Sequence, residues 1–160
     1  MPHSEPARQF LRHTLATLAY RTAKAVRNAP ADFATRKFGE STRTPEQVLA
    51  HMGDLMDWAF SMASGAPAWK DSVPLDWEAE CARFFATVKT FDDFLAADAP
   101  LSYPLEKLFQ GPVADALTHC GQITLMRGLA ASSVRGESYN RADIQIGRVG
   151  REQSPPGGEF

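Results

Sequence analysis

Four amphipathic segments of about twenty residues each constrain the fold of this chain more than any other feature. Within each segment the apolar residues recur at three- and four-residue intervals, which places them on one face of an α-helix. The segments span residues 7–28, 44–64, 75–97 and 111–132. Helices of this length extend about 30 Å and can pack side by side along their whole length. The sequence therefore predicts an all-α protein, a four-helix bundle.

The clearest helix boundary in the sequence is at Thr44. Threonine is a favoured N-cap residue, Pro45 suits the first helical position, and Gln47 can complete a capping box. Gly65 is expected to end this helix. The connection before it, residues 29–43, is longer than most helix connections, so we expect it to cover or line a site.

The composition of the chain changes after residue 132, where Ser, Gly, Arg and Pro become frequent. We therefore expect residues 1–132 to form the bundle and residues 133–160 to form an extended segment packed on it. The end of that segment, residues 150–160, is expected to be flexible. The chain has 160 residues, of which 44% are hydrophobic, and this is enough for one domain with its own core.

The net charge and the hydropathy of the chain limit which partners and which cellular location we expect. The net charge is −2, and the basic residues of the first helix are most simply solvated or paired with acids across the bundle, so nucleic acid is not an expected partner. No stretch approaches the roughly 18 apolar residues of a membrane span, and no signal peptide is recognisable. Cys81 and Cys120 lie in apolar helical patterns as small packing residues, which favours a reducing, cytoplasmic setting.

Two of the predicted helices each carry a histidine on the apolar face. His51 lies three residues after Val48, and His119 lies four residues after Asp115, so Asp115 and His119 share one helix face. If the two helices face each other, His51, Asp115 and His119 could converge as ligands for a divalent metal such as Zn, Ni, Mn or Fe. Three protein ligands leave a position open for water or substrate.

Other interpretations of the same residues stay open at this point. A histidine on an apolar face is more often hydrogen bonded in a core than bound to metal, and Asp115 is favoured by the helix dipole without any ion. Asp54 could orient the His51 ring. His13 is expected at the surface and His3 in a frayed terminus.

The runs TPEQVLAHMGDL at residues 44–55 and DALTHCGQI at residues 115–123 resemble the DinB-like superfamily. That group includes the YfiT-type metal-dependent hydrolases and the S-transferases that use mycothiol or bacillithiol. The resemblance implies an up-down-down-up bundle, a bound divalent metal and a homodimer. His51 and His119 match the family's first and last metal ligands, whereas Asp115 stands where the family usually has histidine.

The resemblance implies an enzyme in which the metal activates a water or a thiolate, with a low-molecular-weight thiol as a further cofactor. Gln122, on the same helix face as His119, is expected to act in catalysis by placing the small-molecule substrate. One alternative is a metal-free helical module for binding or dimerisation, in which these residues only fix the core. A second, less favoured, is a stress-linked nucleic-acid partner.

Overall fold

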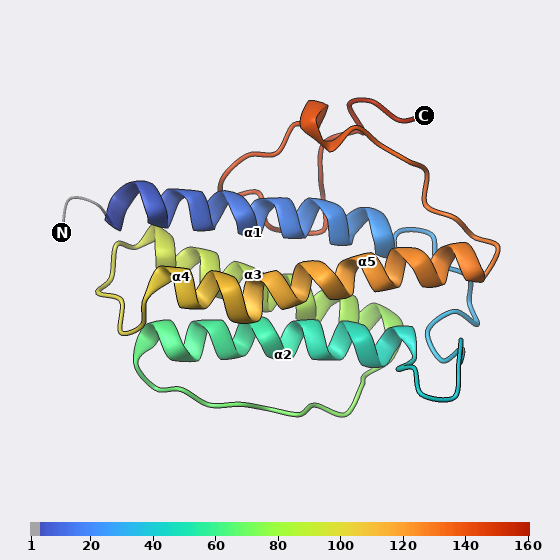
Figure 1. Cartoon of the computed structure of the whole chain (residues 1–160), viewed down its shortest axis with the longest axis horizontal. Helices are drawn as coiled ribbons and strands as arrows, with labels where there is room; N and C mark the ends of the chain where they lie inside the picture. The colour runs from blue at the N-terminus through green and yellow to red at the C-terminus, as the bar shows by residue number, and fades with distance from the viewer. Residues whose placement is uncertain (1–3) are drawn as a thin grey trace.

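The protein is a bundle of α-helices, as the sequence predicts (Figure 1). The computed structural model describes residues 4–160, so His3 lies outside the described residues. The helical elements are α1 (Ser4–Val26), α2 (Pro45–Ser64), α3 (Trp77–Ala96), α4 (Leu105–Leu108), the π-helical turn η1 (Phe109–Val113), α5 (Ala114–Leu129) and the short 3₁₀ turn η2 (Tyr139–Arg141).

The four long helices pack in a ring. Both α1 and α2 contact α3 and α5, so α1 and α2 occupy opposite corners of the bundle. Figure 1 shows α1 and α5 running in one direction and α2 and α3 in the other, which is an up-down-down-up arrangement. Because α2 and α3 run in the same direction, the connection between them, residues 65–76, returns along the length of the bundle.

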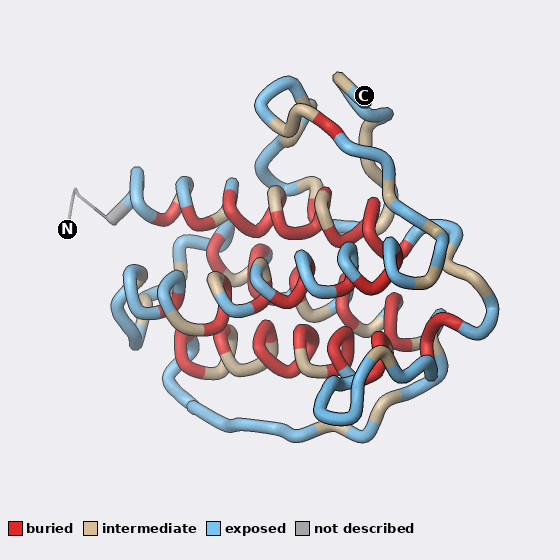
Figure 2. Tube along the Cα trace, turned by 45° about the vertical axis from the view of Figure 1, so that its right-hand side comes forward, coloured by how far each residue is buried: buried red, intermediate tan, exposed pale blue. Residues whose placement is uncertain are grey.

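The core lies where the inner faces of the four helices meet (Figure 2). Leu15 of α1, Met52 of α2, Phe84 and Phe91 of α3, and Ile123 of α5 are fully buried. Burying each of these side chains contributes about 1.5–3 kcal/mol. None of the helices between residues 4 and 160 carries an apolar run long enough to cross a membrane.

The start of α2 follows the predicted capping pattern. The Thr44 side chain accepts a hydrogen bond from the Gln47 backbone N–H, and the Gln47 side-chain oxygen accepts one from the Thr44 N–H. Gly65 ends the helix at φ 90°, in the left-handed region that favours glycine. These two boundaries define the length of α2, from Pro45 to Ser64.

The predicted start of the fourth long helix is wrong. We expected this helix to begin at Gly111, whereas the chain is helical from Leu105 and widens into the π-helical turn η1. Pro112 lies inside this turn and has no N–H to donate to the carbonyl four residues earlier. A wider turn accommodates that missing bond without breaking the helix. Asp115 is the second residue after it, in the first turn of α5.

Two buried arginines donate hydrogen bonds to backbone carbonyls at the ends of helices. Arg127 donates hydrogen bonds to the backbone carbonyls of Ala25, Arg27 and Asn28 at the end of α1. Arg8 does the same at the end of α3, where it binds the carbonyls of Leu95 and Ala99. These carbonyls have no partner within their helices, and a cation there also meets the negative end of the helix dipole.

The C-terminal segment lies across α1 on the outside of the bundle (Figure 1). Lys24 of α1 bonds to Glu137 at 3.2 Å and to Glu159 at 3.1 Å. The Phe160 N–H donates to the Gly136 carbonyl, so the two ends of the segment lie side by side. The flexibility expected for residues 150–160 stays a prediction.

Candidate metal centre

The three predicted metal ligands lie together between α2 and α5. Their ligand atoms are all within 4.8 Å of one another. His51 Nε2 is 3.6 Å from one carboxylate oxygen of Asp115, and His119 Nε2 is 3.3 Å from the other. The two imidazole rings stand nearly perpendicular, with centroids 4.8 Å apart. This His51–Asp115–His119 cluster could therefore hold a metal ion.

The spacing of these atoms is close to what one ion requires. Ligands bound tetrahedrally at about 2.1 Å are about 3.4 Å from one another. The separations of 3.6 and 3.3 Å, from His51 and His119 to the two different oxygens of Asp115, bracket that value, and the three ligand atoms lie within 4.8 Å of one another. Two imidazole nitrogens and one carboxylate are also a donor set that suits zinc and related divalent ions. The residues present therefore fit a divalent metal in number, kind and separation.

Gln122 forms a hydrogen bond with the His119 ring. Its side-chain oxygen lies 2.7 Å from His119 Nδ1, one helical turn along α5. With that oxygen as acceptor, Nδ1 carries the proton and Nε2 keeps its lone pair. Metal-binding histidines in proteins usually have their second nitrogen held in this way. The geometry thus gives Gln122 a positioning role through His119.

This tautomer makes the contact between His119 and Asp115 unfavourable unless a cation joins them. Nε2 and the carboxylate oxygen are both acceptors at 3.3 Å, so each presents negative charge density to the other. A metal ion between them, or a second proton on His119, removes that repulsion. The side chain of Asp115 is 47% exposed, so a metal ion or a proton can reach it from solvent.

His51 is held in its neutral form by its surroundings. Burial lowers the pKa of His51, and the positive charge of Arg43 lowers it further, while Asp115 acts in the opposite direction. Neutral imidazole is the form that binds metal. Trp69 packs edge-on against the His51 ring at 5.7 Å and in turn against Trp58. The connection between α2 and α3 therefore covers one side of the cluster.

Two cavities open beside the cluster. The larger, about 560 Å³, reaches His119 and Gln122, and most of its lining surface is apolar. The smaller, about 210 Å³, reaches His51 and is lined by polar groups. Arg43, at the end of the 29–43 connection, lines both. The 29–43 connection therefore lines these cavities, and whether they form a site stays a prediction.

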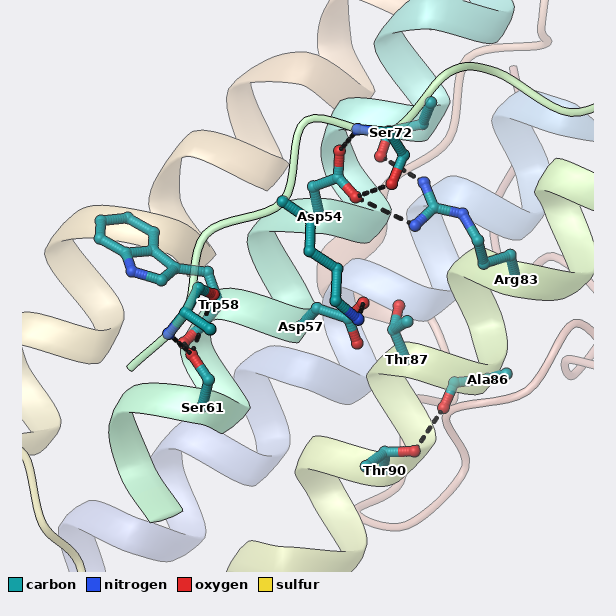
Figure 3. A network of polar contacts seen from close by, with 12 residues as sticks. Asp54, Asp57, Trp58, Ser61, Ser72, Arg83, Ala86, Thr87 and Thr90 are labelled. Carbon is teal, nitrogen blue, oxygen red and sulfur yellow. Dashed lines mark hydrogen bonds and ion pairs between the residues drawn. The ribbon is translucent and has the colours of Figure 1, made fainter. Parts of the chain in front are cut away.

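Asp54 does not orient His51, contrary to our expectation. Figure 3 shows Asp54 turned toward Ser72 and Arg83. It accepts hydrogen bonds from the backbone and hydroxyl of Ser72, at 2.9 and 2.7 Å, and pairs with Arg83 at 3.1 Å. Arg83 also binds the fully buried Glu80 and the Ala50 carbonyl. Position 54 lies closer to α3 around the helix than His51 does, which explains the difference.

The other residues considered for the site take no part in the cluster. His13 is exposed on α1 and Cys120 is buried as a packing residue, both as expected. Gly53 leaves room for the Arg83 side chain, because a Cβ there would lie 3.0 Å from the guanidinium. Gly121 faces open space.

Sequence reasoning missed three features of this region: Arg43, the packing of Trp69 on His51, and the Asp54–Arg83–Glu80 network. Arg43 directly precedes the N-cap of α2, so the start of the helix that carries His51 was the available signal. The other two depend on how residues 65–76 return along α2. Comparison with known proteins gives no match to a family model, to a curated protein or to a solved structure.

Proposed function

We propose that this chain is a divalent-metal-dependent enzyme of the DinB-like type, a hydrolase or a thiol-dependent S-transferase. The single observation that carries the proposal is the convergence of His51, Asp115 and His119 at ligand-like separations beside an apolar cavity. A divalent ion bound there supplies a lowered pKa for a water or a substrate thiol, near 7, so that the deprotonated nucleophile forms at neutral pH.

The residues around the cluster have separate roles in this proposal. His51, Asp115 and His119 hold the ion, and Gln122 keeps the His119 proton on Nδ1 so that Nε2 is available. Trp69 excludes water from one side of His51. The reacting part of the substrate enters from the larger cavity, which reaches His119.

Two further parts of the proposal concern setting and assembly. Cys81 and Cys120 are both free and buried, which supports a reducing, cytoplasmic location. The homodimer is proposed on the family resemblance alone. Light scattering of the purified protein measures the assembly directly, and a monomer across the accessible concentration range would remove that part.

The metal itself is the first test. Protein purified without an affinity tag is stripped with chelator and titrated with zinc against a competing indicator. We expect one equivalent to bind, and expect His51→Ala and His119→Ala to lose that binding. His13→Ala is the matched control, because His13 is an exposed histidine on α1 and should leave the titration unchanged.

The same titration separates this proposal from a metal-free binding or dimerisation module. In that alternative, His51 and His119 only fill the core, so replacing them leaves metal content unchanged and chelator has no effect on the melting temperature. Zinc binding that is equal in wild type, His51→Ala and His119→Ala would overturn the enzyme proposal.

A further inference from the structure

The larger cavity has a chemical character that the proposed activity does not itself require. Its volume is about 560 Å³, within the range of pockets that enclose small organic ligands. Most of the wall is apolar, and the apolar side chains are Phe38, Val48, Leu125, Met126 and Leu129. Leu125 and Leu129 are 65% and 58% exposed, although both are large hydrophobic residues. An apolar ligand over this wall would cover them.

Arg43 is the cationic side chain in this wall. It is exposed, and among residues 4–160 it forms no ion pair with an acidic residue. Several other arginines between residues 4 and 160 also have no acidic partner, so what distinguishes Arg43 is its place in the wall of this cavity. A guanidinium at the edge of an apolar cavity offers a planar pair of donors that matches a carboxylate.

The position of Arg43 relates the cavity to the metal ligands. The same side chain also lines the polar cavity at His51. Arg43 therefore borders both the cavity that reaches His119 and the cavity that reaches His51. A ligand anion held by Arg43 would be beside the cluster, with its apolar body toward Leu125 and Leu129.

We propose that the larger cavity is the substrate site and that it selects a small monocarboxylate with an apolar body. Arg43 binds the carboxylate, and the apolar wall formed by residues of the 29–43 connection, α2 and α5 binds the body. The inference rests on the proposed function only in calling the ligand a substrate. The binding itself depends on Arg43 and on the apolar wall.

The test compares 4-phenylbutyrate with 4-phenylbutan-1-ol by isothermal titration calorimetry. The two probes share one apolar body and differ in charge. We expect the acid to bind saturably with one site and more tightly than the alcohol. Arg43→Gln should weaken binding of the acid about tenfold or more, the loss typical of a charge-assisted hydrogen bond, and leave the alcohol nearly unchanged.

Two other variants check the site. Arg135→Gln makes the same change at an exposed arginine of the C-terminal segment and should bind both probes as wild type does. Leu125→Asp adds a carboxylate to the exposed part of the wall and should weaken the acid more than the alcohol. Circular dichroism confirms that each variant folds.

The outcomes separate this inference from the proposed enzyme. Titrations are run with chelator and with zinc, so metal binding and carboxylate binding are read independently. Loss of zinc binding with retained, Arg43-dependent acid binding removes the enzyme and keeps the carboxylate site. Equal affinity for acid and alcohol, equal losses in Arg43→Gln and Arg135→Gln, or no saturable binding overturns the inference even where zinc binds.

Discussion

Helix α2 carries two polar clusters within one turn of each other, and they differ in whether their charges are matched. On the side toward α3, Asp54 and Glu80 share Arg83, and their oxygens also accept hydrogen bonds from Ser72 and Leu75. On the side toward α5, one carboxylate faces two imidazoles, whose charge depends on a proton or a metal. The first cluster is complete within the chain, and the second lacks a permanent cation.

This difference predicts different roles for the two clusters. A buried network whose acceptors all meet donors fixes the packing of α2, α3 and residues 65–76 and has little left to bind. A cluster of acceptors beside a cavity gains by taking up a cation. Buried polar residues therefore indicate a site when donors and acceptors do not balance, and indicate a structural network when they do.

The largest effect is expected on the matched side, in Arg83→Met. This change leaves Asp54 and Glu80 buried without their cation, so we expect a loss of about 3 kcal/mol in the free energy of unfolding. Urea denaturation measures it. Lys89→Met is the control, because Lys89 and Asp93 form an exposed pair on the same helix, worth less than about 1 kcal/mol. Equal losses in the two variants would contradict the structural role of the network.

A smaller effect is expected on the unmatched side, in Gln122→Leu. The side chain can no longer hold the His119 proton on Nδ1, so zinc affinity should fall about 10- to 100-fold. Gln122→Glu keeps an acceptor oxygen and should retain most of the affinity. Gln110→Leu, at an exposed glutamine of η1, serves as the control. Unchanged zinc affinity in Gln122→Leu would show that the tautomer is set in another way.

The smallest effect is the pH dependence of the metal-free protein. The pKa of His51 is lowered in the folded chain, mainly by burial, below the 6.5 typical of an unfolded histidine. Between those two values the unfolded chain binds more protons, so stability falls as the pH drops through that window and levels off below the folded pKa. Urea denaturation with chelator present, from about pH 8 to about pH 5, should show this fall in wild type and a weaker fall in His51→Gln. An identical fall in both would assign it to other groups.

Much of the fold could be predicted from the sequence because its signals are local. Helical periodicity located the four long helices, and Thr44, Gln47 and Gly65 marked the ends of α2. The π-helical turn η1 was missed, because proline at position 112 is equally typical of a helix start. Whether Pro112 begins a helix or lies inside a longer one depends on whether the residues before it pack against the other helices. Such tertiary contacts cannot be predicted from a local sequence pattern.

For the candidate site, too, the features with a local sequence signal were predicted and those that depend on tertiary contacts were not. The four-residue spacing of Asp115 and His119 is a local property, so the sequence could place both on one face of α5. The approach of His51 required two helices to be neighbours, and the predicted bundle made that an expectation that the structure now meets. The role of Asp54 was mistaken because its partners, Ser72 and Arg83, come from a connection and a helix whose positions no local pattern determines.

The parallel direction of α2 and α3 limits how this protein can tolerate deletions. A twenty-residue helix spans about 30 Å, and the twelve residues from 65 to 76 reach at most about 40 Å when fully extended. The connection that carries Trp69 and Ser72 is thus only about three residues longer than this span requires. Removing more than about three residues would leave α3 unable to begin beside the start of α2. The direction of the two helices therefore requires a long connection, and this connection is the one that places Trp69 over His51.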